Sequence, residues 1–131
     1  MGNKKTIIYA EDDESINRIS LRFFERMLSE YNIESYLNGT TLENRLKGNK
    51  KNIVAVITDN QMPGIEGSKI IKEYAQNPNY SHIPFILVYG GEDEIGKKAV
   101  ENGAYSFIKK PITDWKDYCE KIKKAIINSK K

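Results

Sequence analysis

The sequence predicts a doubly wound α/β domain in which five buried parallel strands alternate with helices. Short apolar runs recur five times along the 131 residues, with stretches of helical character between them. Most of these runs are continuously apolar, as strands buried on both faces are. Right-handed crossovers between parallel strands place helices on both sides of the sheet. A chain of this length forms one core, so we expect residues 1–131 to be a single domain with flexible tails at 1–5 and 129–131.

A change in apolar spacing predicts the first strand and the first helix. Ile7–Ala10 is an apolar run that ends in a group of acids. Beyond it, Ser15 is the predicted N-cap of a helix. Four apolar residues then recur at the spacing of one helical face: Ile16, Ile19, Phe23 and Met27. These residues are therefore expected to face the core.

Three further strand and helix units are predicted in the middle of the chain. The strands are expected at Ile33–Leu37, Ile53–Thr58 and Phe85–Tyr89, and the helices at Thr41–Lys47, Ser68–Ala75 and Asp93–Asn102. A turn at Asn38-Gly39 precedes the first of these helices, and Gly103 ends the last one.

The last unit combines the strand Ser106–Lys109 with a helix that begins at the N-cap Asp114. Five residues of this helix form one stripe: Trp115, Tyr118, Cys119, Ile122 and Ile126. Cys119 is the only cysteine, and its place in the stripe predicts a small core residue rather than a reactive thiol.

The net charge of +3 comes from the two ends of the chain. Residues 1–5 and 116–131 carry a balance of +6, so the remaining body carries −3. The body has no basic groove with interleaved aromatic residues, which argues against direct binding of nucleic acid. The longest apolar run, Ile53–Ile57, is too short to cross a membrane. A single cysteine and the lack of a secretory signal predict a cytoplasmic protein.

Polar residues gather at the carboxyl ends of the predicted strands, where ligands bind in such sheets. The first strand runs into Glu11-Asp12-Asp13-Glu14, and the third into Asp59. If these strands are neighbours, Asp12 and Asp59 share a small volume and their carboxylates repel each other. Either one of them is protonated, or a hard divalent cation such as Mg²⁺ takes oxygen ligands from both. Asp13 and Glu14 are expected only to favour the helix dipole.

Residues at the other strand ends suggest what such a pocket binds. Lys110 directly follows the fifth strand, and its ammonium group is expected opposite the cation, while Gly90-Gly91 follow the fourth strand. A cation, a carboxylate and an ammonium around one cavity suit a phosphoryl group, with Asp59 as the nucleophile. Backbone N–H groups of the glycine pair would also stabilise its negative charge.

These motifs resemble the response-regulator receiver domains of two-component signalling, the family of the chemotaxis regulators. The resemblance runs from Ile7–Asp13 through Thr58–Gly67 to Phe107–Pro111, and its middle segment is the most specific. It implies a flavodoxin-like (βα)5 fold with the strand order 2-1-3-4-5. The Gln61-Met62-Pro63 triplet and the segment Ser81–Pro84 look most similar to receivers of hybrid histidine kinases and phosphorelays.

The resemblance implies a role for each residue of the predicted pocket. Asp59 matches the phosphoacceptor and Asp12 the direct ligand of Mg²⁺. Glu11 matches an acid that binds the metal through water, and Gln61 would lend its backbone carbonyl. Lys110 matches the lysine that contacts the phosphoryl group.

Two further positions match the switch that couples such a pocket to a distal face. Phe107 matches the aromatic switch residue, and Tyr89 and Gly90 match the loop that binds the phosphoryl group. Tyr89 departs from the pattern, because the family usually has Thr or Ser there. Its hydroxyl stands at the far end of a rigid ring, and the ring competes with Phe107 for volume. We expect chemistry at Asp59 to survive and the coupling to Phe107 to be weakened or rerouted.

The implied function is a phosphorylation-controlled switch rather than a metabolic enzyme. Phosphohistidine on a sensor histidine kinase or a histidine phosphotransfer protein would supply the phosphoryl group to Asp59, with Mg²⁺. A downstream protein would bind the face formed by the fourth helix, fifth strand and fifth helix. The alternative is a pseudo-receiver that binds proteins without phosphorylation, which Tyr89 suggests. An aspartyl-phosphate hydrolase is disfavoured because Gln61 replaces its second acid, and a flavodoxin because acids follow the first strand.

Overall fold

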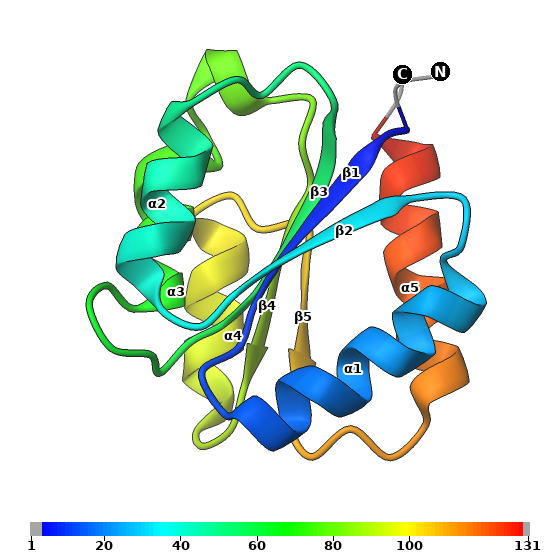
Figure 1. Cartoon of the computed structure of the whole chain (residues 1–131). Helices are drawn as coiled ribbons and strands as arrows, with labels where there is room; N and C mark the ends of the chain where they lie inside the picture. The colour runs from blue at the N-terminus through cyan, green and yellow to red at the C-terminus, as the bar shows by residue number, and fades with distance from the viewer. Residues whose placement is uncertain (1–3, 130–131) are drawn as a thin grey trace.

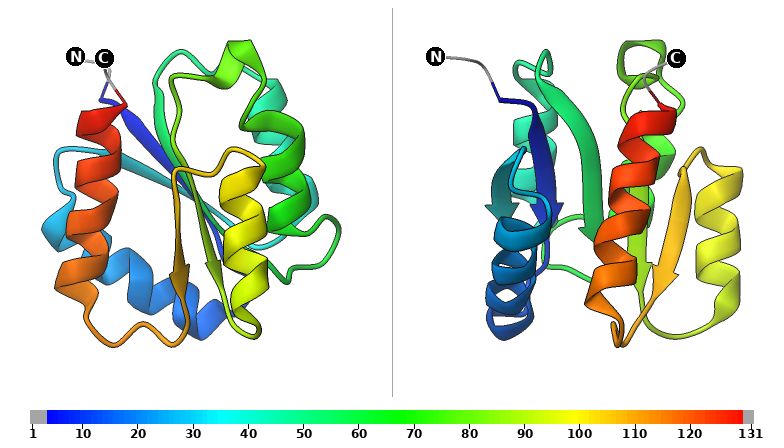
Figure 2. Two further views of the ribbon diagram at one scale, coloured as in Figure 1. Left: turned by 180° about the vertical axis from the view of Figure 1, so that it is seen from behind. Right: turned by 90° about the vertical axis from the view of Figure 1, so that its right-hand side faces the viewer.

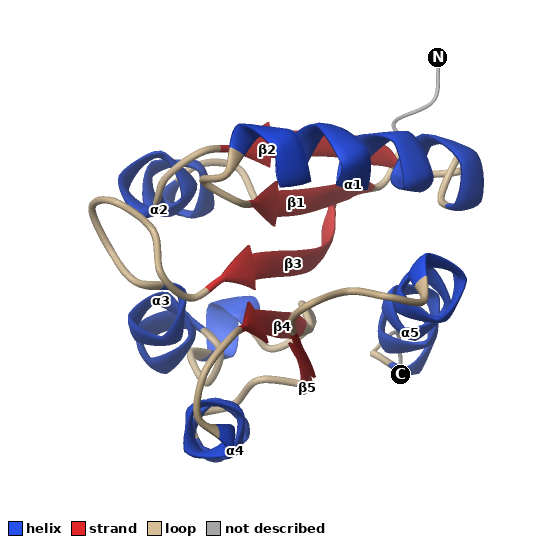
Figure 3. Cartoon of the chain, turned by 90° about the horizontal axis from the view of Figure 1, so that it is seen from below, coloured by secondary structure: helices blue, strands red, loops and turns tan. Residues whose placement is uncertain are grey.

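The computed structural model describes residues 4–129 and contains one parallel five-stranded sheet. The strands are β1 (Thr6–Ala10), β2 (Asn32–Tyr36), β3 (Ile53–Asp59), β4 (Phe85–Tyr89) and β5 (Ser106–Lys109). They lie in the order β2-β1-β3-β4-β5 (Figure 3), which confirms the flavodoxin-like fold that the sequence predicts. Each strand end lies within one residue of its expected place.

Helices cover both faces of the sheet. They are α1 (Glu14–Met27), α2 (Gly39–Lys47), α3 (Gly67–Tyr74), α4 (Asp93–Glu101) and α5 (Trp115–Asn128), and a 3₁₀ turn spans Pro78–Tyr80. In Figure 1, α2, α3 and α4 lie on one side of the sheet, and α1 and α5 lie on the other. The view from behind in Figure 2 shows the same division.

The core has two layers because each strand sends alternate side chains to opposite faces. In β1, Ile7 and Tyr9 pack toward α1 and α5, whereas Ile8 and Ala10 pack in the cluster that includes α2 and α3. All four side chains are buried. Strands that are covered on both faces therefore account for the continuous apolar runs in the sequence.

Helix α1 begins two residues earlier than a Ser15 cap requires. Its N-cap is Asp13, whose side chain accepts a hydrogen bond of 3.0 Å from the backbone N–H of Ile16. The predicted cap at Ser15 is therefore wrong. Because the Asp13 carboxylate reaches a free N–H group at the positive end of the helix, it both caps the helix and complements its dipole.

The buried face of α1 also differs from the expected one. Asn17, Ser20 and Phe24 are buried, whereas Ile19 is 44% exposed. The buried polar side chains are satisfied, since Ser20 bonds the hydroxyl of Tyr9 at 2.7 Å. Phe23 and Met27 pack against the core layer as predicted, but at its edge. Apolar periodicity missed Asn17 and Ser20 because hydrogen bonds make these polar residues acceptable in the core.

Helix α5 matches its predicted pattern. Asp114 caps it by accepting a hydrogen bond from the backbone N–H of Asp117, at 2.9 Å. The Cys119 thiol is buried, and burial raises its pKa to about 11. The thiol is thus protonated at neutral pH, as a core residue is expected to be.

Many of the lysines near the carboxyl end of the sequence belong to α5 rather than to a tail. Lys116, Lys121, Lys123 and Lys124 lie within the helix. The tails expected at 1–5 and 129–131 fall in part outside the described residues 4–129, so they stay a prediction. Among the helices described, none has the length and apolar composition that spanning a bilayer requires.

Candidate functional site

The carboxyl ends of four strands meet around one hollow of about 390 Å³. It is lined by Glu11, Asp12, Asp13, Ile16, Asp59, Asn60, Gln61, Gly90 and Lys110. These residues directly follow or end β1, β3, β4 and β5, or they begin α1. The strand order places the segments side by side, because β1 and β4 both pair with β3. The hollow thus lies where ligands bind in open α/β sheets.

Strand register brings Glu11 and Asp59 together. Ala10 of β1 is in register with Thr58 of β3, so the residues that follow them are neighbours. Glu11 and Asp59 are 2% and 6% exposed, whereas Asp12 is exposed. Each of the three acids offers one carboxylate oxygen, and these atoms lie within 4.8 Å of one another.

Lys110 bridges the two buried acids. Its Nζ atom lies 3.1 Å from Oε1 of Glu11 and 3.0 Å from Oδ1 of Asp59. The backbone N–H of Lys110 donates to the carbonyl of Tyr89 at 2.7 Å, which continues the pairing of β5 with β4 beyond the strand end. The sequence placed this lysine opposite the carboxylates and their cation, whereas the ammonium group contacts the carboxylates directly. It partly offsets the cost of burying two negative charges.

Burial governs the ionisation of the two inner acids. Desolvation raises the pKa values of Glu11 and Asp59, and the charge and hydrogen bonds of Lys110 oppose this rise. Burial alone would lower the pKa of Lys110, but the hydrogen bonds and charges of both acids outweigh it and raise the pKa. The site is therefore a place where added positive charge is favoured.

The donor set fits a hard divalent cation. Three carboxylates from two adjacent strand ends can place oxygen atoms around one point, and Mg²⁺ takes oxygen ligands and keeps several waters. Asp12 is exposed and its neighbour Glu11 is buried, so the cluster joins the interior of the hollow to solvent. Glu11, Asp12 and Asp59 are the residues that would hold such an ion.

Asn60 holds the loop that follows Asp59, a role that sequence reasoning missed. Its backbone N–H donates to Oδ1 of Asp59 at 2.9 Å and also to the carbonyl of Val88 at 3.0 Å. Its side-chain oxygen accepts from the backbone N–H of Ser68 at the start of α3. Gly67 makes this approach feasible, since a Cβ atom there would lie 2.1 Å from the Asp59 carbonyl oxygen. The only signal in the sequence is the position of Asn60 beside Asp59.

Asn17 supports Glu11 in a similar way and was also missed. Its side-chain amide donates to the carbonyl of Glu11 at 3.1 Å and accepts from the hydroxyl of Ser35 at 2.9 Å. The backbone N–H of Asp13 donates to Oε2 of Glu11. No local pattern points to Asn17, because its partners come from β2 and from the end of β1.

The remaining predicted residues divide between the hollow and the core layer between the sheet and α4. Gln61 and Gly90 are exposed and line the hollow. The peptide bond between Lys110 and Pro111 is cis. Tyr89 is 1% exposed, and its ring packs in the core layer that contains Ala99 of α4, so its side chain is not part of the lining.

Phe107, the predicted switch residue, lies next to Tyr89 and outside the hollow. Its side chain is 40% exposed, and the centroids of the two rings lie 5.8 Å apart. The structure thus gathers six predicted residues at the hollow and leaves the Tyr89 ring and Phe107 on the α4 side of the sheet.

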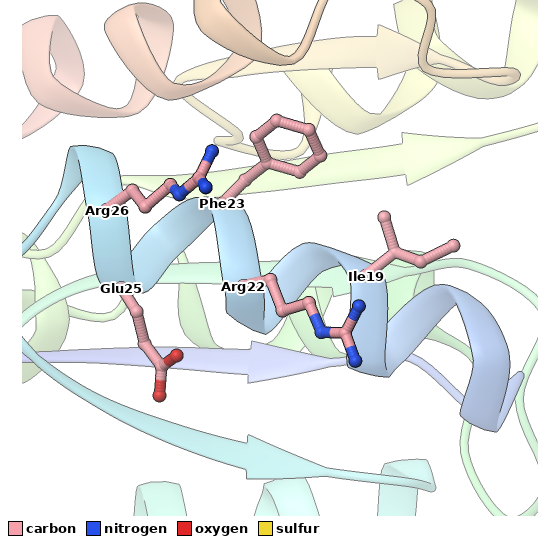
Figure 4. A pocket seen from close by; sticks show the side chains of 5 residues that line it. All are labelled: Ile19, Arg22, Phe23, Glu25 and Arg26. Carbon is pink, nitrogen blue, oxygen red and sulfur yellow. The ribbon is translucent and has the colours of Figure 1, made fainter.

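A second, more apolar hollow of about 530 Å³ lies along α1 (Figure 4). It is lined by Ile19, Arg22, Phe23, Glu25 and Arg26. The ring of Phe23 stacks on that of Trp115 from α5, with centroids 4.9 Å apart and an angle of 4° between the planes. Ile16, at the edge of the acidic hollow, precedes Ile19 by one helical turn. An apolar surface, made by Ile16, Ile19 and Phe23 and flanked by the charged Arg22, Glu25 and Arg26, therefore extends from the acidic site along α1.

The fold and the acidic hollow together define a receiver-type α/β module, a class of signalling switch. A family model described as "Response regulator receiver domain" matches residues 7–123, and the chain belongs to this family. The family places it in two-component signalling. Receiver domains bind Mg²⁺ at an acidic pocket and interact with histidine kinases or phosphotransfer proteins.

Curated relatives and solved structures agree with this assignment. A cyclic di-GMP phosphodiesterase of Thermotoga maritima is 30% identical over 108 residues, which cover 82% of this chain and 27% of that protein. A two-component response regulator of Oryza sativa subsp. japonica is 27% identical over 121 residues, 88% of this chain and 70% of the relative. A receiver domain structure from Clostridium thermocellum has a TM-score of 0.84 at 24% identity and covers 96% of this chain and 97% of that one. The chain thus spans about a quarter of the length of the phosphodiesterase.

Proposed function

We propose that this chain is a phosphorylation-controlled switch that accepts a phosphoryl group on Asp59 from a phosphohistidine donor. The observation that carries the proposal is the position of Lys110, whose ammonium group lies 3.0 Å from the Asp59 carboxylate and 3.1 Å from that of Glu11. The Lys110 ammonium group at this point can leave the carboxylates and contact the oxygens of an incoming phosphoryl group. A mere structural salt bridge does not explain the third acid, Asp12, within the same cluster.

The chemistry that we propose is a direct displacement at phosphorus. An oxygen of Asp59 forms the new P–O bond while the P–N bond to the donor imidazole breaks, and the imidazole takes up a proton. The hydrogen bond from the Asn60 backbone N–H to Oδ1 orients the nucleophile. Lys110 stabilises the charge on the phosphoryl oxygens, and the backbone at Gly90 can approach them closely because Gly90 has no side chain.

Mg²⁺ is part of the proposal. Glu11, Asp12 and Asp59 would hold it, with the backbone carbonyl of Gln61. When bound there, it supplies positive charge against the negative charge of the transferred group. The hydrolysis of the aspartyl phosphate at the same site would be the only turnover, so we assign no metabolic reaction to the chain.

The partners and location follow from this chemistry. The donor would be a sensor histidine kinase or a histidine phosphotransfer protein, and a downstream protein would bind the face formed by α4, β5 and α5. We further propose that the apolar surface along α1 helps to seat the donor, since it borders the acidic hollow at Ile16. A cytoplasmic location completes the proposal and is consistent with the free thiol of Cys119.

Intact-mass measurement after incubation with Mg²⁺ and acetyl phosphate tests the function. We expect one added phosphoryl group in the wild-type protein and none in Asp59→Asn. Asp117→Asn serves as a control, because Asp117 lies on α5 away from the hollow and its loss should leave the adduct unchanged.

The alternative is a receiver fold that binds proteins without phosphorylation. The burial of the Tyr89 ring favours it, because the usual small hydroxyl is missing from the site. Failure to form an adduct with acetyl phosphate, with phosphoramidate and with a phosphorylated histidine phosphotransfer protein would establish this alternative and reject the proposed function.

A further inference from the structure

Tyr89 and Phe107 share one compartment between the sheet and α4. Tyr89 ends β4, and its buried ring belongs to the core layer of α4. On the neighbouring strand Phe107 is in register with Leu87, which lies two residues before Tyr89 and so on the same face. The two rings are tilted by 60°, with 5.8 Å between their centroids. Tyr89 is 1% exposed and Phe107 40%, so Tyr89 occupies the inner position.

A missing side chain in α4 makes this arrangement feasible. Gly96 lies in the middle of α4 and is buried. A Cβ atom at Gly96 would lie 2.7 Å from the Tyr89 hydroxyl oxygen and 2.6 Å from Cδ1 of Phe107, closer than real Cβ atoms approach. Glycine is unfavourable inside a helix, so a steric need of this kind accounts for its presence.

The compartment leaves Tyr89 no room to move. Its ring is buried, and its hydroxyl end already lies in the space that the missing side chain of Gly96 leaves on α4, here called the notch at Gly96. One turn earlier, an ion pair of 2.6 Å between Asp93 and Lys109 ties the start of α4 to the end of β5. Inward rotation of Phe107 would require the volume that the Tyr89 ring fills.

We infer that Tyr89, seated in the notch at Gly96, is a lock that holds Phe107 outward whether or not Asp59 carries a phosphoryl group. The face formed by α4 and β5 then presents the same aromatic side chain in both states. That Phe107 ignores phosphorylation of Asp59 rests on the proposed function, whereas the lock itself rests only on packing. A signal from Asp59 would have to leave the domain by movement of segments other than Phe107.

A double-mutant cycle of Gly96→Ala and Tyr89→Thr tests the packing. In the wild-type background we expect Gly96→Ala to lower the folding equilibrium constant by about tenfold or more, although alanine is the better helix former. With Tyr89→Thr, Phe107 can turn into the vacated volume, and Gly96→Ala should then lose most of this penalty. Gly48→Ala, where the new methyl group makes only an ordinary contact, 3.5 Å from the Arg45 carbonyl oxygen, should behave alike in both backgrounds. Equal effects of Gly96→Ala in the two backgrounds would overturn the lock.

Fluorine NMR of protein labelled with fluorophenylalanine tests the orientation of Phe107. The Phe107 signal is identified by its loss in Phe107→Leu. Beryllofluoride with Mg²⁺ serves as the phosphoryl mimic, and its own fluorine signal reports whether it has bound. With the mimic bound, we expect the wild-type Phe107 signal to keep its position and its quenching by a soluble paramagnetic agent. In Tyr89→Thr the signal should shift and the quenching should fall.

The two proposals fail in different ways. An inward shift of the wild-type Phe107 signal with the mimic bound would overturn the lock and leave the proposed function intact. Failure of the mimic to bind would instead count against the proposed function. The lock is then decided by Phe107 quenching in the unliganded proteins, where equal quenching in wild type and Tyr89→Thr would reject it.

Discussion

The Nζ atom of Lys110 lies 3.0 Å from Oδ1 of Asp59, although the two residues come from the ends of β5 and β3, which are not adjacent strands. β4 lies between them, and the exposed Gly90 follows its last residue at the hollow. The absence of a side chain at Gly90 leaves the path between the lysine and the acid open. The Lys110 ammonium group can therefore contact both Asp59 and Glu11, although Glu11 follows β1, which lies one strand farther from β5 than β3 does.

Replacement of Lys110 should slow phosphorylation strongly. Loss of the ammonium group removes a fixed positive charge from the point where phosphoryl oxygens would lie, and the rate with acetyl phosphate should fall by about a hundredfold in Lys110→Ala. Intact mass followed over time gives the rate. Lys109→Ala is the matched control, because Lys109 pairs with the exposed Asp93 outside the hollow and its loss should change the rate little. Equal rates in the two variants would contradict the role of Lys110.

The same ammonium group should make the stability of the protein depend on pH in the alkaline range. The pKa of Lys110 is raised in the folded protein above the ordinary value of 10.5. Its stabilising contribution is therefore complete below pH about 10.5 and is lost as the pH rises through the folded-state pKa. The difference in melting temperature between wild type and Lys110→Ala should be constant up to about pH 10.5 and shrink as the pH rises further. A difference that grows with pH in the alkaline range would contradict the ion pairs.

Mg²⁺ should stabilise the folded chain through Asp12. Binding to the folded state alone adds about 1.4 kcal/mol at a concentration of ten times Kd. Urea unfolding with and without Mg²⁺ should show this gain in the wild-type protein and little of it in Asp12→Asn. Glu14→Gln removes an equal charge from an exposed residue that does not line the hollow, and it should keep the gain. Similar losses in both variants would indicate diffuse charge rather than a site.

The apolar surface of α1 should matter for a protein donor and not for a small one. Ile19 is 44% exposed and lies one turn beyond Ile16, at the edge of the acidic hollow. Ile19→Ala should slow transfer from a phosphorylated histidine phosphotransfer protein about tenfold and leave the rate with acetyl phosphate unchanged. Ile127→Ala removes an even more exposed side chain from the far end of α5 and should affect neither rate. An equal loss with both donors would mean that Ile19 acts on the site itself.

Strand positions could be predicted because apolar runs and turn residues are local signals. β4 and β5 begin and end where the sequence indicates, and β2 is displaced by one residue. The buried face of α1 could not be predicted in this way. Asn17 and Ser20 are acceptable in the core only through hydrogen bonds to residues of other elements, and a periodic count of apolar residues contains no such information.

The acids and the lysine of the site could be named from the sequence, since each follows a predicted strand. Their arrangement could not, because it depends on strand order and register. The pairing of Ala10 with Thr58 sets Glu11 beside Asp59, and only then does Lys110 reach both. The roles of Asn60 and Asn17 as supports likewise depend on contacts between elements.

The sequence by itself determined the fold class, the family and the set of polar residues at the strand ends, because these depend on local pattern and motif. Only the tertiary structure decided that Lys110 bridges two buried acids and that the Tyr89 ring fills the space under α4. The physical reason is that packing and ion pairing join residues distant in the chain. The notch at Gly96 illustrates this, since a glycine in a helix acquires meaning only when Tyr89 and Phe107 are seen beside it.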